Sequence, residues 1–212
     1  MKTFEQMIEG YSRFRQGDWQ KQHDRWEQLK EGQSPQVMVI ACSDSRVDPA
    51  QIFDVDPGEI FVVRNVAALV PPFETTPGQH GVSAALEFAV QFLKVREVGV
   101  MGHGMCGGCK AALSQSLRGN APGAGGFVDD WISLLDEARE KVVADHGDSG
   151  RAAEIEMEHA GVRVSLENLM TFPWVKEKVA SGELTLRGSF FAISDGILHL
   201  MNPETKEFEP AA

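Results

Sequence analysis

Two short stretches decide the fold of this chain. The first is Ala41–Arg46 (ACSDSR) and the second is Gly102–Gly108 (GHGMCGG). Each follows an apolar run that predicts a buried strand: Gln36–Ala41 (QVMVIA) precedes the first stretch, and Glu97–Met101 (EVGVM) precedes the second. We therefore expect both stretches to leave the carboxyl ends of core strands, where open parallel sheets bind their ligands.

Cys42, His103 and Cys106 are the metal-binding residue types in these two stretches. Strands that end at the same edge of a sheet can bring two thiols and an imidazole to one point. Two thiolates and one imidazole form a zinc ligand set that leaves the fourth position open, as in catalytic rather than structural zinc sites. The sequence thus predicts one zinc ion per chain, bound by these three residues.

Cys109 and His80 leave alternatives open. Cys106 and Cys109 have the C-x-x-C spacing of a redox dithiol, and Cys109 could instead supply a fourth thiolate that closes a structural zinc site. Neither alternative gives a role to the acidic residue of the first stretch. The simpler interpretation places Cys109 as a small buried residue on the helix after the site. His80, in the loop before another helix, could also approach the site.

Asp44 and Arg46 stand within four residues of Cys42. The aspartate could itself bind zinc, or the arginine could hold its carboxylate in a bidentate pair and keep it ionised. A simpler role is an ion pair that fixes the loop after the strand. Both roles can hold at once, because ion pairs often orient the ligands of a metal site.

Size and charge limit the function classes. The 212 residues are 42% hydrophobic and 24% charged, which suits one α/β domain with a full core. The net charge of −11, without a basic cluster, argues against nucleic acid or an anionic membrane surface as a partner. The apolar runs are shorter than a membrane span. Three cysteines and a polar N-terminal stretch unlike a signal peptide predict a cytoplasmic protein.

The pattern of the first half predicts a mostly parallel sheet. Apolar residues at helical spacing indicate two helices within residues 3–31, the second capped by Asp18. Glu59–Arg64 (EIFVVR) reads as a further strand and Val82–Leu93 as a helix. The order strand, loop, strand, helix, strand is typical of a parallel sheet with helices on its faces.

The second half predicts helices followed by a hairpin. Helices are expected over residues 107–117, 128–144 and 150–180, with a break at Pro173. The hairpin is expected from Leu184–Ile193 and Ile197–Met201, joined across the two-residue turn Asp195-Gly196. The chain after the hairpin is expected to be frayed.

Three motifs together resemble the β-class carbonic anhydrases. They are CSDSR (Cys42–Arg46), PGEIFVVRNVA (Pro57–Ala67) and GHGMCGG (Gly102–Gly108), and the resemblance covers the chain from Gln33 to the hairpin near Ile193. The segment VVRNVAALVPP is similar to the plant-type branch of this family. The resemblance implies a mostly parallel β-sheet flanked by helices, with N-terminal helices that pack on the partner subunit of a dimer.

The resemblance also implies a domain organisation. The chain would be a single β-carbonic anhydrase domain over residues 1–212. Residues 1–31 would form an N-terminal helical arm and residues 32–120 the zinc-binding core. Residues 121–212 would form the C-terminal helices and the β-hairpin.

The resemblance assigns roles to three groups of residues. The zinc ligands would be Cys42, His103 and Cys106, with Asp44 and Arg46 as the catalytic dyad. The substrate would be bound by Gln33 from across a dimer interface, the Gly107 backbone N–H, and an apolar pocket of Phe61, Val66 and Phe88. The family usually has tyrosine where Phe88 stands, so a hydroxyl contact is absent from this position.

The activity implied by the resemblance is the zinc-dependent reversible hydration of carbon dioxide to bicarbonate and a proton, by attack of zinc-bound hydroxide. Such an enzyme is a lyase, also called carbonate dehydratase, and would be a homodimer or a dimer of dimers (a homotetramer). Two other hypotheses are a related zinc protein that has lost catalysis and a structural zinc module. The presence of Asp44 and Arg46 argues against both.

Some bacterial members of the resembled family bind bicarbonate at a second site, which moves the dyad aspartate onto zinc. That site uses a tryptophan, an arginine and a tyrosine. Here Arg64 is present, but Val39 and Phe191 stand at the other two positions. Neither can donate a hydrogen bond to an anion, so we expect Asp44 to pair with Arg46.

Overall fold

The computed structural model describes residues 2–211. The chain divides into two compact units, Met1–Ser34 and Pro35–Ala212. No helix among the described residues is both long and apolar enough to cross a membrane.

The first unit is helical, as the sequence predicts. It contains α1 (Phe4–Gln16), α2 (Asp18–Lys21) and α3 (His23–Leu29), so the second predicted helix is split in two. A capping box starts α1, in which the Gln6 N–H donates to Thr3 Oγ1 (3.4 Å) and the Thr3 N–H donates to Gln6 Oε1 (3.0 Å).

The predicted cap at Asp18 is wrong. Asp18 is the first residue of α2, which lacks a side-chain cap, and its carboxylate instead accepts a hydrogen bond from Lys21 Nζ at 3.1 Å. An ion pair one turn along the helix has taken the place of the expected cap.

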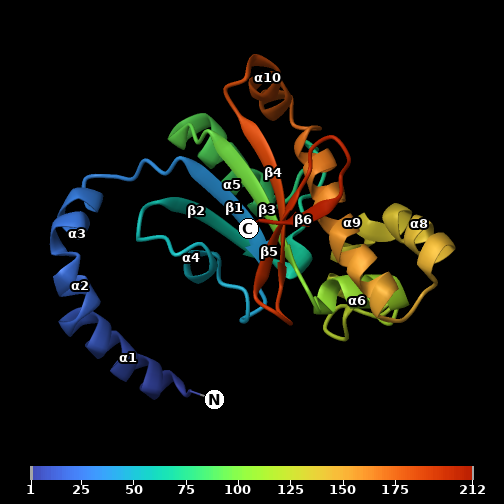
Figure 1. Ribbon diagram of the computed structural model, residues 1–212, viewed down its shortest axis with the longest axis horizontal. Helices are drawn as coiled ribbons and strands as arrows, with labels where there is room; N and C mark the ends of the chain where they lie inside the picture. Colours follow the sequence, from blue (N-terminus) through green and yellow to red (C-terminus); the bar gives the residue numbers. More distant parts are fainter. Residues whose placement is uncertain (1, 212) are drawn as a thin grey trace. The chain divides into compact units, whose positions relative to one another are not determined.

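The second unit is built on a six-stranded sheet of order β2-β1-β3-β4-β5-β6. Its strands are β1 (Val37–Cys42), β2 (Ile60–Asn65), β3 (Glu97–His103), β4 (Thr185–Ala192), β5 (Ile197–Met201) and β6 (Phe208–Pro210). The first four strands run parallel, and β5 and β6 are antiparallel additions at one edge (Figure 1). The predicted α/β class with a mostly parallel sheet is confirmed.

The strands β1 and β3 run further than the sequence pattern indicates. Cys42 is the last residue of β1 and pairs with Asn65, and His103 is the last residue of β3 and pairs with Phe191. Pairing with a neighbouring strand keeps both residues extended, and the pairing partner cannot be read from one apolar run. Two of the three predicted metal ligands therefore belong to the rigid sheet itself.

Helices cover both faces of the sheet. The helical elements are α4 (Pro49–Ile52), η1 (Val66–Ala68), α5 (Gly81–Glu87), η2 (Phe88–Leu93), α6 (Gly107–Ser114), α7 (Gly126–Ile132), η3 (Ser133–Leu135), α8 (Asp136–His146), α9 (Arg151–Leu169) and α10 (Pro173–Ser181). Figure 1 shows α6, α8 and α9 gathered on one side of the sheet. Alternate residues of β1 enter opposite cores: Val39 and Ala41 face one, and Met38 and Ile40 face the other.

Four local expectations are corrected. The helix over residues 82–93 changes to a π-helix at Phe88, and α6 ends at Ser114 because Gln115 takes a left-handed conformation (φ 52°). The hairpin loop comprises residues 193–196, since Ala192 pairs with Ile197. The C-terminal segment is not frayed up to residue 211: Phe208 pairs with Met201 in β6 and its ring stacks on His159 at 4.2 Å.

Candidate metal centre

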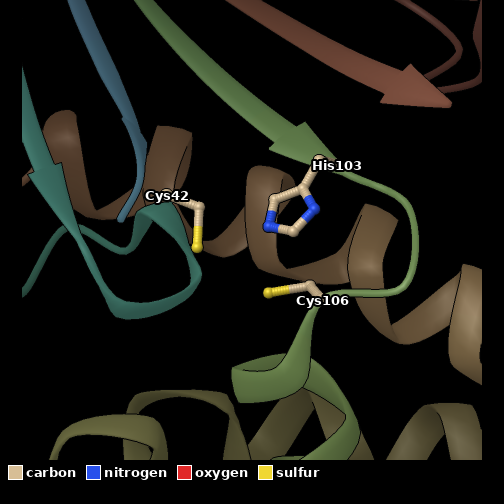
Figure 2. Close-up of side chains that lie close together, drawn as sticks. All are labelled: Cys42, His103 and Cys106. Carbon is tan, nitrogen blue, oxygen red and sulfur yellow. The ribbon is translucent and has the colours of Figure 1, made fainter. Parts of the chain in front are cut away.

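The three predicted metal ligands meet at one edge of the sheet. Cys42 ends β1, His103 ends β3, and Cys106 is the N-cap residue of α6. The two sulfur atoms and a ring nitrogen lie within 4.8 Å of one another, and all three residues are buried (Figure 2). Because two of these residues end paired strands and the third caps the helix that follows β3, the backbone brings all three to the same edge of the sheet.

His103 is prepared to bind a metal through Nε2. Its side chain is 1% exposed, and Nδ1 lies 3.0 Å from the Gly104 carbonyl oxygen. A carbonyl only accepts hydrogen bonds, so Nδ1 carries the proton and Nε2 has a free lone pair. This nitrogen is buried without a hydrogen-bond partner among the residues that the structure describes. Burying such a group costs free energy unless something binds it, and a metal ion does so.

The two thiols also fit a divalent cation. Their mutual hydrogen bond, together with burial, raises the pKa of Cys42 to about 12. A hydrogen bond with Cys109 raises the pKa of Cys106 to about 12. Two adjacent buried thiols resist ionisation in this way, and a bound cation reverses the effect by stabilising both thiolates. Two thiolates and one imidazole are ligands that zinc accepts.

Cys109 lies beside Cys106 but outside the ligand group. It is buried in the first turn of α6, and Gly161 of α9 packs close to its sulfur. Among residues 2–211, the group of mutually close ligand atoms consists of Cys42, His103 and Cys106. The geometry thus favours an open site over the closed site that Cys109 would complete.

Asp44 and Arg46 form the bidentate pair that the sequence suggests. Arg46 Nε donates to Asp44 Oδ1 at 2.9 Å, and Nη2 donates to Oδ2 at 2.7 Å. The Arg46 backbone N–H also donates to Oδ1 at 2.9 Å. These hydrogen bonds hold the pKa of the Asp44 carboxyl well below its usual range, so the carboxylate is ionised at neutral pH.

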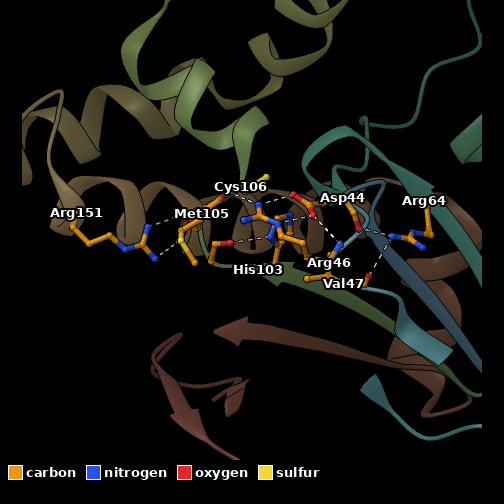
Figure 3. Close-up of polar contacts among 10 residues, drawn as sticks. Asp44, Arg46, Val47, Arg64, His103, Met105, Cys106 and Arg151 are labelled. Atoms are coloured by element: carbon orange, nitrogen blue, oxygen red, sulfur yellow. Dashed lines mark hydrogen bonds and ion pairs between the residues drawn. The ribbon is translucent and has the colours of Figure 1, made fainter. Parts of the chain in front are cut away.

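Arg64 braces the loop that follows β1. Its guanidinium donates to the carbonyl oxygens of Cys42 (2.8 Å) and Asp44 (2.6 Å) and to the Asp48 carboxylate (2.8 Å). A longer bond reaches the Val47 carbonyl at 3.4 Å (Figure 3). Arg64 is the arginine that the resemblance associates with a second bicarbonate site. Its guanidinium N–H groups therefore already donate hydrogen bonds to this loop.

A different pair of residues holds the turn between His103 and Cys106. The Cys106 N–H donates to Glu158 Oε1 at 3.2 Å, and Arg151 contacts both oxygens of the same carboxylate at 3.0 and 3.2 Å. Burial raises the pKa of Glu158, and the Arg151 ion pair opposes that shift. Arg46 reaches the turn from the other side, with Nη2 donating to the Met105 carbonyl at 3.0 Å (Figure 3).

Glu158 and Arg151 are not among the site residues predicted from the sequence. The signal that could have found Glu158 is a charged residue inside the buried stripe of α9, between Met157 and Ala160. A charge on the apolar face of a helix is rare unless it is paired. Arg151 carries no such signal, because its side chain is 45% exposed.

The residues assigned to substrate binding lie at several places in the fold. The rings of Phe61 on β2 and Phe88 on η2 pack with centroids 5.8 Å apart, and Phe88 is 45% exposed. Val66 is 37% exposed and lies so close to Gly108 that a Cβ there would approach its Cγ1 to 2.8 Å. Gly107 is the exposed first residue of α6.

Gln33 and His80 take no part in the hydrogen bonds described above. Gln33 is exposed in the unit Met1–Ser34, so its role at the site rests on the resemblance alone. His80 precedes α5 and hydrogen-bonds to the Thr76 carbonyl at 2.8 Å. It lines a cavity of about 640 Å³ together with Asn65, Val66 and Trp131.

The sequence of this chain also matches a known protein family. Residues 37–198 match the carbonic anhydrase family model. The chain therefore belongs to the carbonic anhydrase family, and its relatives place it in the β class, whose metal is zinc.

Three relatives illustrate the match. Beta carbonic anhydrase 5, a chloroplastic protein of Arabidopsis thaliana, is 34% identical over 91% of this chain. This chain spans 63% of the length of that relative. The solved β-carbonic anhydrase CcaA has a TM-score of 0.89 and 31% identity, covering 98% of this chain and 92% of its own. A tetrameric β-carbonic anhydrase of Sordaria macrospora has a TM-score of 0.79 and 26% identity, covering 94% and 96%.

Proposed function

We propose that this protein catalyses the reversible hydration of carbon dioxide to bicarbonate and a proton, as a zinc-dependent lyase. The observation that carries the proposal is the position of the Asp44–Arg46 pair, two residues from a metal ligand and bonded to the turn that holds another. Zinc bound by Cys42, His103 and Cys106 supplies the Lewis-acid chemistry that makes hydroxide available from water near neutral pH. Belonging to the carbonic anhydrase family supports the same reaction.

Asp44 orients the nucleophile in this proposal. An ionised carboxylate accepts hydrogen bonds and cannot donate them, so it selects an oxygen that carries a proton. Arg46 keeps the carboxylate charged and fixes both of its oxygens. A nucleophile held in this way directs its lone pair away from the carboxylate and toward the substrate.

The residues that the resemblance assigns to the substrate suit an apolar substrate and an anionic product. Phe61, Val66 and Phe88 are apolar side chains that can hold carbon dioxide without competing for the metal. The Gly107 N–H, at the start of α6, is suited to an oxygen that gains negative charge during the reaction. Gln33 of a second subunit would provide another polar contact.

A hydration assay tests the proposal directly. Zinc-loaded protein should accelerate the acidification of carbon dioxide solutions, and removal of zinc with a chelator should abolish the acceleration. Zinc added back should restore it. Zinc-loaded, folded protein without activity would leave a zinc-binding relative that has lost catalysis.

We also propose a homodimer or a dimer of dimers. Helix α1 exposes the large apolar residues Phe4, Met7, Ile8 and Tyr11, which favour burial against a partner. Strand β2 is an edge strand, and its Val62 is exposed. Light scattering should give a mass of at least two chains, and deletion of residues 1–30 should cause aggregation. A soluble, active monomer after the deletion would contradict the proposal.

A further inference from the structure

The turn that carries Cys106 needs support from outside itself. Met105 has a left-handed backbone (φ 56°), which a residue with a side chain rarely adopts. Cys106 is the N-cap residue of α6, and the helix supplies no acceptor for its N–H. Cys106 is also buried, so an unpaired N–H there would be costly. Something must fix this turn before the Cys106 sulfur can point toward the metal.

Glu158 provides that support from α9. Its side chain is buried, with the residue 3% exposed, and Oε1 accepts the Cys106 N–H at 3.2 Å. A charged side chain in such a place is rare and requires compensation. Here Arg151, one side of which faces water, contacts both carboxylate oxygens at 3.0 and 3.2 Å and fixes their orientation.

Two ion pairs lie against the turn. Arg151 passes close to its start, since a Cβ at Gly104 would lie in van der Waals contact with Arg151 Nη2 at 3.4 Å. On the opposite side, Arg46 donates to the Met105 carbonyl at 3.0 Å while it holds Asp44. Two ion pairs thus hold the Met105–Cys106 segment. Asp44–Arg46 binds the Met105 carbonyl, and Arg151–Glu158 binds the Cys106 N–H.

We propose that Glu158, oriented by Arg151, is a positioning residue for the metal ligand Cys106. It acts through the hydrogen bond to the Cys106 N–H, which sets the direction of the thiolate toward Cys42 and His103. The inference rests on the proposed zinc site, but it concerns metal binding and not turnover. Its success or failure is therefore separate from that of the proposed carbon dioxide hydration.

The chain offers a matched set of variants. Glu158→Met removes the acceptor and keeps the length of the side chain, whereas Glu158→Gln keeps an acceptor oxygen. Glu154→Met is the control, because Glu154 also contacts Arg151 (3.5 Å) and lies on the same helix. Its other partner is Lys110 at 3.0 Å, on the exposed side of α6.

The measurement is the zinc dissociation constant of the full chain, determined by competition with a chromophoric chelator. Loss of a group that orients a metal ligand typically weakens metal binding by about 10–100-fold, and we expect a loss in this range for Glu158→Met. Glu154→Met should stay close to the parent, and Glu158→Gln should lose less affinity than Glu158→Met, because its amide oxygen can still accept the Cys106 N–H. The thiolate-to-metal absorption of the cobalt(II) protein should change in Glu158→Met alone. Carbon dioxide hydration is recorded separately.

A merely structural role for Glu158 predicts a different pattern. It would lower the urea resistance of the metal-free protein and leave the zinc dissociation constant and the cobalt spectrum unchanged, and that result would overturn the proposal. If Glu158→Met does not fold, Arg151→Met decides, because its partly exposed side chain is easier to replace. Unaltered zinc binding in folded Arg151→Met would then overturn the proposal, and weakened binding would support it.

Discussion

The backbone next to Cys42 is held by a cationic side chain, whereas the backbone N–H of Cys106 is held by an anionic one. The loop after β1 is braced by Arg64, which donates to the carbonyl oxygens of Cys42 and Asp44. The turn after β3 is braced by Glu158, which accepts the N–H of Cys106. Arg64 meets backbone carbonyl oxygens, which accept hydrogen bonds, whereas Glu158 meets a backbone N–H, which donates one. The charge of each side chain therefore suits the backbone group that it contacts.

The largest effect should come from removing either loop's sulfur. Cys42→Ser and Cys106→Ser should each lower the zinc content from about one ion per chain to near zero and abolish turnover, because two remaining ligands bind zinc poorly. Elemental analysis of the purified proteins measures the zinc. Full zinc content in either variant would show that the two loops do not contribute equally, and would direct attention to Cys109.

The next largest effect should be a loss of turnover without a loss of zinc, on replacing Asp44 in the first loop. Asp44→Asn should keep zinc but lower turnover by about 100-fold or more, because the amide can donate a hydrogen bond and misorient the nucleophile. Parallel measurements of zinc content and carbon dioxide hydration test this. Near-parent turnover with full zinc content would refute the role proposed for Asp44.

Arg64 permits a direct test of the first brace. Arg64→Met should weaken zinc binding by about 10–100-fold, because the carbonyls of the Cys42–Asp48 loop lose their common donor. Arg64→Lys should restore only part of the affinity, since an ammonium group cannot span several acceptors as a guanidinium does. Equal affinities for parent and Arg64→Met would show that only the second loop needs a brace.

His159, the neighbour of Glu158 on α9, should affect stability and not the site. Burial between Phe190 and Phe208, with Arg163 and His199 nearby, lowers the pKa of His159 to about 4. The unfolded chain, with a histidine pKa of about 6.5, then binds more protons than the folded chain between these values. Stability should therefore fall as the pH drops from about 6.5 toward 4, by at most about 1.4 kcal/mol per pH unit.

Urea unfolding of the parent and of His159→Phe at several pH values measures this contribution. Phenylalanine can keep the stacking on Phe208, and it carries no proton. The variant should show a weaker pH dependence in that interval, and an identical dependence would exclude His159 as its source.

The smallest effect should be the response to bicarbonate. The donors of Arg64 already bind the first loop, and Val39 and Phe191 offer no hydrogen bond to an anion. Inhibition by bicarbonate should therefore follow a simple hyperbola. A sigmoidal curve would show that Arg64 can leave the loop to bind an anion.

The sequence by itself determined the class of fold and the candidate metal ligands. Apolar runs before Cys42 and before His103 indicated core strands, and a parallel sheet brings the ends of such strands to one edge. The residue types at those ends were sufficient to predict zinc. The pair Asp44 and Arg46 was also predictable, because its members are close in the chain and need no tertiary contact to meet.

Only the tertiary structure decided how the ligands are held. Glu158 meets Cys106 across a separation of 52 residues, and Arg64 meets Cys42 across 22, so no local pattern indicates either contact. The ion pair at Asp18 and the pairing of β6 depend on which of several possible local contacts forms in the folded chain. Local sequence places groups at the ends of secondary structure, whereas the packing of distant elements decides which backbone group meets which charged side chain.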